Sequence, residues 1–290
     1  MNSPVRPVSA AEFPSLLREI PQPPDTLTYR GTLPSPELKL IAVVGSRKYT
    51  TYGKQVVDHL IDGLAGYPVG IVSGLALGID SLAHEAALRN DLYTLAIPGS
   101  GIDDTVIYPA RHKPLARRIL ESGGGLLSEF APNFTATKWS FTQRNRLMAG
   151  ITHATLVIEA TERSGTLITA RLAIDYNREL LVVPGNIFSV GSAGTHQFLK
   201  LGATPVTTAT DILHALGIDP EMVAARATPA LLSDLSAPEQ AVLAALTEPT
   251  DRDTLIRASG LPPAAANALL MQMEMNGLIA AEQNQYRAVI

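Results

Sequence analysis

Short, continuous apolar runs alternate with segments of helical period through much of this chain. Five runs have the length of a strand, at residues 40–44, 69–72, 93–97, 155–158 and 180–183. Because the runs are continuous rather than alternating, we expect strands that are covered on both faces, which is typical of a parallel sheet. Between them, segments such as 55–64 and 167–176 place apolar residues on one helical face. The pattern predicts an α/β fold with a doubly wound, mostly parallel sheet.

The same pattern divides the chain into four parts. Residues 1–36 are rich in proline, with a short helical stretch near 11–20, so we expect an extension that packs on the main domain or frays. Residues 37–218 hold the α/β domain, and residues 219–235 form a linker. Residues 236–290 predict three helices and a hairpin, which together describe a small winged-helix domain.

Composition narrows the choice of partners and compartment. The 290 residues are 46% apolar, enough for two folded units, and the absence of cysteine excludes disulfides and thiolate metal sites. No apolar run has the length of a signal peptide or a membrane span, so we expect a cytoplasmic protein without a membrane partner. The net charge of −4 is unlike that of a generic nucleic-acid binder, so any DNA binding must be local. Residues 229–290 hold three basic and seven acidic residues, which leaves phosphate binding to the larger domain.

Small and basic residues follow the first two strands, where parallel sheets bind their ligands. Ser46 and Arg47 combine a small residue with a guanidinium that can grip a phosphate, although a tight turn with a solvated arginine explains them equally well. Ser73, Gly74 and Gly78 precede a helix, where unpaired amides form a plausible phosphate cradle. This loop lacks the Lys-Ser/Thr ending of a P-loop, so we do not expect ATP hydrolysis.

Two further patterns suggest cofactors but do not meet their requirements. Gly99 and Gly101 resemble a dinucleotide fingerprint whose third glycine is missing, so no nucleotide cofactor is expected. Asp80 and His84 share a helix face and could be metal ligands. An aspartate that favours the helix dipole, beside a packed histidine, is the preferred interpretation, and we expect no metal.

The densest group of candidate side chains lies at residues 138–146. It interleaves cations and aromatic rings: Lys138, Trp139, Phe141, Arg144, Asn145 and Arg146. Cations hold the phosphates of a single strand, while rings stack on its bases for about 1–3 kcal/mol per base. The alternative is that Trp139 and Phe141 anchor the core and that Arg144 or Arg146 pairs with Glu129 or Glu159.

A last candidate loop, Ser164, Gly165 and Thr166, opens the helix that begins near residue 167. Its hydroxyls can cap this helix, and its exposed amides offer a second binding site for an anion. Capping alone would explain the serine and the threonine.

Together these segments resemble the DprA (Smf) family of DNA-processing proteins. The resemblance is carried, in order, by Gly45-Ser46-Arg47, Ser73-Gly74-x-Ala76-x-Gly78-Ile79-Asp80, Gly99-x-Gly101 with Tyr108-Pro109, Arg144-Asn145-Arg146, Ser164-Gly165-Thr166, Pro184-Gly185 and Gly202-Ala203. It spans residues 38–216.

The resemblance implies an extended Rossmann-like core that binds single-stranded DNA, dimerises through that core and catalyses nothing. It also implies that the protein protects incoming DNA and loads the RecA recombinase onto it during natural transformation. Arg47 would then grip a phosphate, Lys138 would lie beside the DNA and Phe141 near a base. Many members carry a helical N-terminal domain, whereas we expect only about 36 irregular residues before the core in this sequence. The acidic winged helix is expected to contact protein rather than DNA.

Two other functions are weighed against this one. The core also resembles the LOG nucleoside-monophosphate phosphoribohydrolases, but Thr169 stands where their signature has a glutamate, and the loss of that carboxylate removes an acidic catalytic group. A winged-helix transcription factor is disfavoured because residues 263–275 hold no lysine or arginine to position a duplex.

Overall fold

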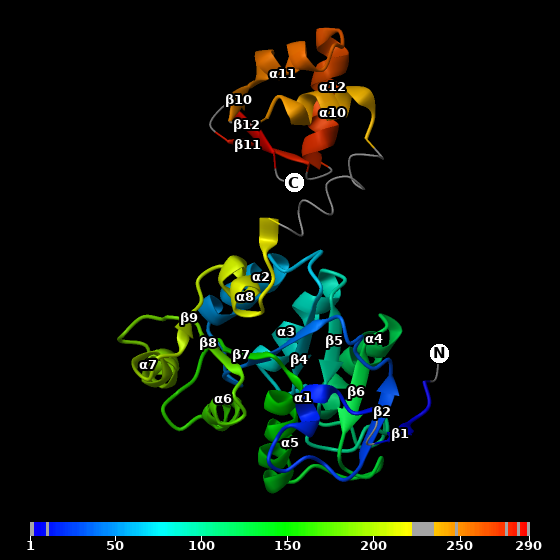
Figure 1. The fold of residues 1–290 in the computed structure, drawn as a ribbon, viewed down its shortest axis with the longest axis vertical. Helices are drawn as coiled ribbons and strands as arrows, with labels where there is room; N and C mark the ends of the chain where they lie inside the picture. The colour runs from blue at the N-terminus through cyan, green and yellow to red at the C-terminus, as the bar shows by residue number, and fades with distance from the viewer. Residues whose placement is uncertain are drawn as a thin grey trace. The chain divides into compact units, whose positions relative to one another are not determined.

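A nine-stranded sheet lies at the centre of the first of two units, Met1–Ile218, in this computed structural model (Figure 1). The structure describes residues 3–9, 12–221, 235–246, 249–275, 278–282 and 285–288. The strand order is β1-β2-β6-β5-β4-β3-β7-β8-β9. Seven strands run parallel: β3 (Lys39–Val44), β4 (Val69–Ser73), β5 (Tyr93–Ala96), β6 (Gly125–Ser128), β7 (Ala154–Val157), β8 (Glu179–Val182) and β9 (Thr204–Pro205). The order reverses at β3, so the predicted doubly wound, mostly parallel, Rossmann-like sheet is confirmed.

Helices cover both faces of the sheet, which explains the continuous apolar runs. One face carries α2 (Thr51–Asp62), α3 (Ile79–Arg89), α4 (Lys113–Glu121) and α8 (Ala209–Ala215). The other carries α1 (Ser15–Arg18), α5 (Lys138–Ile151) and α6 (Thr166–Asp175), and α7 (Ala193–Lys200) packs beside β8. Two short 3₁₀ helices, η2 (Ala110–His112) and η3 (Val190–Ser192), precede α4 and α7. No described helix is both long enough and apolar enough to span a bilayer.

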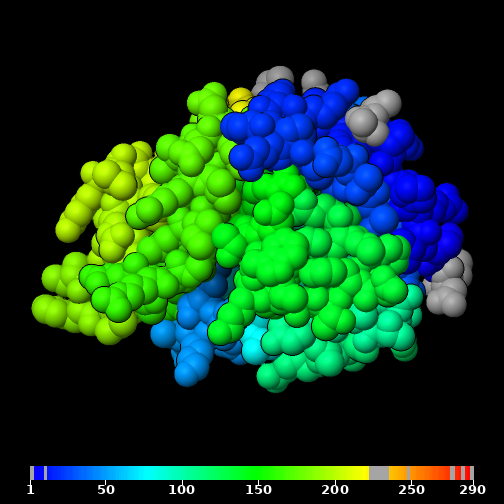
Figure 2. Space-filling model, turned by 90° about the horizontal axis from the view of Figure 1, so that it is seen from below, coloured from blue at the N-terminus to red at the C-terminus, as the bar shows by residue number. Residues whose placement is uncertain are grey.

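Two segments within residues 1–36 form strands of the sheet, which the sequence analysis did not predict for this extension. β2 (Leu27–Gly31) pairs antiparallel with β6, and β1 (Arg6–Val8) pairs with β2. Leu17 and Ile20 are buried, and a Cβ at Gly150 of α5 would lie only 3.0–3.1 Å from their side chains. Figure 2 shows this N-terminal segment seated beside the residues of α5. The sequence did not predict these strands because β2 is stabilised by pairing with β6, which lies far along the chain.

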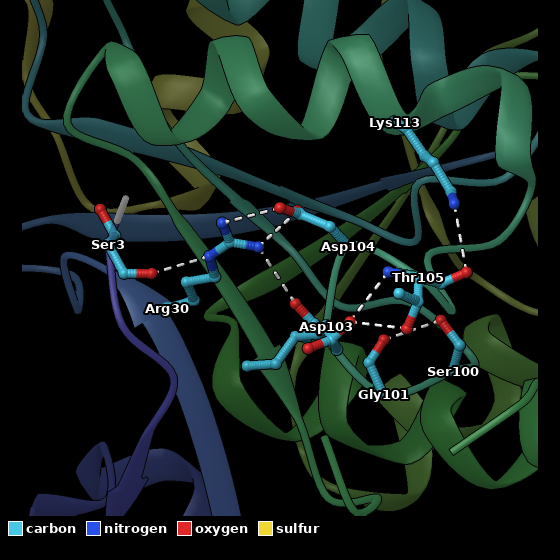
Figure 3. A network of polar contacts seen from close by, with 9 residues as sticks. Ser3, Arg30, Ser100, Gly101, Asp103, Asp104, Thr105 and Lys113 are labelled. Carbon is cyan, nitrogen blue, oxygen red and sulfur yellow. Dashed lines mark hydrogen bonds and ion pairs between the residues drawn. The ribbon is translucent and has the colours of Figure 1, made fainter. Parts of the chain in front are cut away.

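A charge-assisted network joins these N-terminal strands to the loop after β5 (Figure 3). Arg30 of β2 is only 8% exposed, and its Nη1 and Nη2 donate to the carboxylate of Asp104 at 2.6 and 3.3 Å. Its Nε donates to the carbonyl of Ser3 at 2.8 Å, and Lys113 donates to the carbonyl of Thr105 at 3.1 Å. Arg30 therefore fixes a loop that begins and ends beside the candidate site, at Gly99 and Tyr108.

The second unit, Asp219–Ile290, has its own core and its own sheet. It consists of α10 (Ala237–Ala244), β10 (Thr250–Asp251), α11 (Arg252–Ala258), α12 (Pro263–Met275), β11 (Ile279–Glu282) and β12 (Gln285–Ala288). Three helices and a sheet of order β10-β12-β11 are the elements of a winged helix. Most of the predicted linker, residues 222–234, lies outside the described residues.

We expect Arg30→Ala to lower the free energy of unfolding by about 1–3 kcal/mol, because a nearly buried guanidinium loses an ion pair and its backbone partners. Urea unfolding would measure this. The matched control is Arg171→Ala, since Arg171 is exposed on α6 and its side chain has no hydrogen bond or ion pair with any other described residue. Equal unfolding curves for the two variants would contradict the assigned role of Arg30.

The effect of Arg30→Ala should also depend on pH. The hydrogen bond from Arg30 lowers the pKa of Asp104, against a smaller opposing effect of burial. A carboxyl whose folded pKa is lowered stabilises the fold above its unfolded pKa, near 3.9, and this contribution is lost as pH falls through the folded pKa. The difference between wild type and variant should therefore narrow below about pH 4.

Candidate nucleic-acid interface

The loop after β3 is held against the start of α3, which leaves Arg47 exposed. Gly78 has φ +88°, and a Cβ there would lie 2.2 Å from the carbonyl oxygen of Ser46. The amide of Ile79 donates to that same oxygen at 3.1 Å. The Ser46 hydroxyl accepts from the amide of Lys48 at 3.0 Å, which closes the turn. Gly78 is therefore needed for close backbone approach, and the turn presents Arg47 to solvent.

Arg47 lies over an aromatic ring that comes from a different part of the chain. Its Cζ is 5.4 Å from the centre of the Phe141 ring, and the centres of the Tyr108 and Phe141 rings are 5.6 Å apart. A Cβ at Gly99 would lie 2.5 Å from Phe141, so only glycine leaves room for this ring. Together with Gly74, Ala76, Leu77 and Pro109, these side chains line a shallow hollow. The hollow places a cation beside two aromatic rings, as single strands require.

The first turn of α5 supplies the second exposed cation. Thr137 and Ser140 form a capping box, and the Ser140 hydroxyl also donates to the carbonyl of Gly99 at 2.6 Å. This bond ties α5 to the loop after β5. Lys138 is exposed and lies three residues before Phe141, so the two side chains are neighbours on the helix surface.

Trp139 is not part of the core, so the alternative that it anchors the core is wrong. It is 57% exposed. Its ring forms T-shaped contacts with the rings of Phe130 and Phe134, with ring centres 5.5 and 5.9 Å apart. The sequence reasoning also left Tyr108 out of the site. Its sequence signals were its place in the loop after the third strand and the Tyr108-Pro109 pair, which is one of the segments that carry the family resemblance.

Arg144 points inward, although it was a candidate for contact with DNA. It is 4% exposed, and its Nη1 donates to the carbonyl of Ile97. A Cβ at Gly74 would lie 2.0 Å from the same nitrogen, so the guanidinium packs on the glycine backbone. Burial lowers the pKa of Arg144 to about 10, and the nearby Asp80 carboxylate opposes this shift. Arg144 thus remains a cation at neutral pH and orders the loops after β4 and β5.

Asn145 and Arg146, the other two residues of the Arg144-Asn145-Arg146 triplet, are only partly exposed. Arg146 pairs with Glu129 and also donates to the carbonyl of Gln22, so the alternative that this arginine forms an internal ion pair is confirmed. Burial raises the pKa of Glu129, against the attraction of Arg146. Asn145 is half-buried, and its side chain has no hydrogen bond with another described residue.

The amides of the loop after β4 are occupied by an internal anion. Asp80 is buried, and its Oδ2 accepts from the amides of Gly74 and Ala76 at 3.1 and 3.4 Å. Burial raises the pKa of Asp80, while Arg144 and the two amides oppose the shift. The Ser73 hydroxyl is also buried and donates to the carbonyl of Val43 at 2.6 Å. Asp80 thus already accepts from two of the amides of the predicted phosphate cradle, those of Gly74 and Ala76, and the Ser73 hydroxyl points into the sheet.

His84, the other possible metal ligand, packs in the core. It is fully buried, with Nδ1 2.7 Å from the hydroxyl of Thr94, and burial lowers its pKa to about 3. Within the described ranges, no three histidine, aspartate or glutamate side chains are grouped so that they could hold a metal ion.

The loop before α6 lies against the loop after β3. The Thr166 hydroxyl donates to the carbonyl of Gly45 at 3.1 Å, and the Thr166 amide donates to the Ser164 hydroxyl at 3.2 Å. Gly165 is exposed, and a Cβ there would meet nothing within 4 Å. The structure therefore brings Ser164, Gly165 and Thr166 next to Ser46 and Arg47, at the point where the strand order reverses.

The fold and the site define a Rossmann-like protein with a cationic, aromatic surface at the carboxyl ends of its strands. The DNA recombination-mediator protein A family matches residues 5–217, and the DprA winged helix domain matches residues 226–284. This chain belongs to the DprA (Smf) family of DNA-processing proteins.

Similarity to individual relatives extends over most of the chain. It is 35% identical to protein Smf of Escherichia coli over 97% of this chain and 76% of the relative. The DprA structure from Streptococcus pneumoniae superposes with a TM-score of 0.67 at 37% identity, covering 72% of this chain and 73% of that one. The DprA of Helicobacter pylori, described for its single-stranded DNA binding mode, gives 0.65 at 28% identity, covering 74% and 98%.

We expect Gly78→Ala to destabilise the protein by about 1–3 kcal/mol, because the new Cβ meets backbone that cannot move away and the φ favours glycine. Gly165→Ala is the matched control, because Gly165 has helical φ and open space, so the change should be neutral or stabilising by about 0.4–1 kcal/mol. Thermal or urea unfolding measures the change in the free energy of unfolding for both variants. A harmless Gly78→Ala would contradict the described contact with Ser46.

Proposed function

We propose that the protein binds single-stranded DNA across the carboxyl ends of its parallel strands. The observation that carries the proposal is the exposed guanidinium of Arg47 over the ring of Phe141, with Lys138 one helical turn away. Phosphates lie against the two cations, and a base packs on the aromatic rings.

Exposed cations, rather than backbone amides, supply most of the attraction for phosphate. The amides of Gly74, Ala76 and Thr166 already have internal partners. The first 228 residues carry 20 basic and 20 acidic residues, so no overall positive field assists binding. The affinity therefore rests on a few local contacts, and each of them should have a measurable effect.

Family membership supports a DNA-processing role in transformation. The Helicobacter pylori relative is described by its binding of single-stranded DNA, and we extend that ligand to this chain. We further propose that the protein acts in the cytoplasm, protects incoming DNA and loads RecA onto the bound strand.

We also propose that the protein catalyses no reaction. The alternative of a LOG-like phosphoribohydrolase needs a carboxylate at the position of Thr169. The Thr169 side chain is 1% exposed within α6, where it cannot reach a substrate.

A homodimer formed through the Rossmann-like domain accounts for a concentration of exposed apolar side chains. The large aliphatic residues exposed in the described part of this unit, together with Phe188, all fall between residues 168 and 201: Ile168, Ile174, Ile187, Phe188, Val190 and Leu201. Exposed apolar surface of this kind often marks a protein–protein interface, so we propose this region as the dimer surface.

We expect Arg47→Ala and Lys138→Ala each to weaken binding of a labelled oligo-dT about 10- to 100-fold, the equivalent of a lost charge-assisted contact of about 1.5–3 kcal/mol. Each should also reduce the slope of log K against log salt concentration by about 0.7. Fluorescence anisotropy across a salt series, with duplex competitor, measures both quantities.

Arg171→Ala serves as the control for these two variants, because it removes the same charge from an exposed position on α6. Unchanged affinity in both site variants, or a flat salt dependence of the wild type, would refute the proposed site.

We expect Leu201→Glu to shift the protein from dimer to monomer in light scattering after gel filtration. Leu201 is 76% exposed, so a charge there should not disturb the fold, but it cannot be buried cheaply in an interface. Met271→Glu is the control, since Met271 is 66% exposed in the other unit. A monomeric wild type would overturn the proposed dimer.

A further inference from the structure

A second pocket, of about 420 Å³, lies at the ends of β7 and β8 and is distinct from the hollow beside Phe141. Its lining includes Thr50, Tyr52, Glu159, Asn186 and Ser189. Arg47 and Thr50 belong to one loop, and three residues span at most about 11 Å. The two sites therefore flank the same loop, and an extended strand can pass from one to the other within a few nucleotides.

Glu159 is a buried carboxylate in this pocket with few partners. It is 3% exposed, and it accepts from the amide and hydroxyl of Thr50 at 3.0 and 2.6 Å. No lysine, arginine or histidine among the described residues forms an ion pair with it. A carboxylate has about four acceptor positions, so it can still accept hydrogen bonds from a ligand.

The backbone around Glu159 leaves space for its carboxylate. A Cβ at Gly53 would lie 2.2 Å from Oε2, and a Cβ at Gly191 would lie 3.6 Å from Oε1. Two glycines thus border a group whose charge has no counter-ion in the described structure. Burial of such a group is costly unless additional donors reach it, which a ligand with N–H groups can supply.

The remaining lining fits a flat, amino-bearing ring. The Tyr52 hydroxyl donates to the carbonyl of Pro184 at 2.7 Å, which fixes its ring as a wall of the pocket. The side-chain oxygen of Asn186 accepts from the amide of Phe188 at 2.8 Å, so its NH₂ group is the part available to a ligand. An aromatic wall, a buried acceptor and an amide donor together match the face and the edge of a nucleobase.

We propose that this pocket receives an amino-bearing base, cytosine in particular, from the DNA strand held at Arg47 and Lys138. Cytosine N4 donates to carboxylates, whereas thymine presents its O4 acceptor at the same place and would be repelled by Glu159. Glu159 is thus a specificity-determining residue. This inference rests on the proposed binding of single-stranded DNA, and it adds a base preference to that function.

Anisotropy of labelled oligo-dC and oligo-dT with the full chain, in slightly alkaline solution, tests the proposal. Wild type should bind oligo-dC about tenfold more tightly, as expected for one good base contact. Glu159→Gln should abolish or reverse this ratio, because its amide offers a donor to thymine O4, while affinity for oligo-dT is retained. Equal binding of the two oligonucleotides by wild type would overturn the inference.

Two further variants separate the role of the pocket from that of the fold. Ser189→Trp fills the half-buried mouth and leaves Glu159 in place, so it should also remove the preference even if Glu159→Gln folds poorly. Arg47→Ala should weaken both oligonucleotides equally and keep the ratio. If Ser189→Trp keeps the preference for oligo-dC over oligo-dT, the proposed base pocket is refuted. If wild type binds neither oligonucleotide, the proposed function itself is refuted.

A free nucleotide could also bring a cytosine base to this pocket. Calorimetry with dCMP and TMP distinguishes a free nucleotide from a base of the bound strand. A strand-borne base is held at high local concentration, so free dCMP should bind weakly and should not displace oligo-dC at equal concentration. Tight binding of dCMP that Glu159→Gln abolishes, together with equal affinity for oligo-dC and oligo-dT, would assign the pocket to a free nucleotide and overturn the strand-borne base.

Discussion

The burial of one guanidinium, that of Arg144, determines how the candidate site is built. A buried cation is costly unless it is hydrogen-bonded, and Arg144 meets this demand at the carbonyl of Ile97, against Gly74 and near the Asp80 carboxylate. These contacts bind α5 to the loops after β4 and β5. They also fix the rotation of α5 about its axis, so that Phe141, one turn earlier, packs on Gly99.

Internal and external charges play opposite roles at this edge of the sheet. Asp80 accepts from amides that could have held a phosphate, and it thereby ties the loop after β4 to the first turn of α3. Arg47 and Lys138 remain exposed, with no ion pair to another described residue. A protein of net charge −4 can thus present a local cationic surface, because its excess of acidic residues falls in residues 229–290, outside this surface.

The N-terminal residues support this surface from a distance. Arg30 grips Asp104 in the loop that starts at Gly99 and leads to Tyr108, and the two ends of that loop contact or border Phe141. Strands β1 and β2 therefore extend the sheet and also hold part of the site. The same loop after β3 also contacts the second pocket, where the Thr50 hydroxyl donates to the Glu159 carboxylate. The hollow beside Phe141 and the pocket at Glu159 therefore both depend on this loop.

The sequence by itself determined the parallel sheet, the winged helix, the family and the segments that form the site. Strands buried on both faces must be continuously apolar, and loops that approach one another closely need glycine, so both features appear in local sequence. The tertiary structure alone decided that Arg144 faces inward and Arg47 outward, and that Tyr108 joins the site. It also decided that residues 27–31 form a strand between β1 and β6. Helical period shows which residues share a face, but burial and partners depend on segments that are distant in sequence.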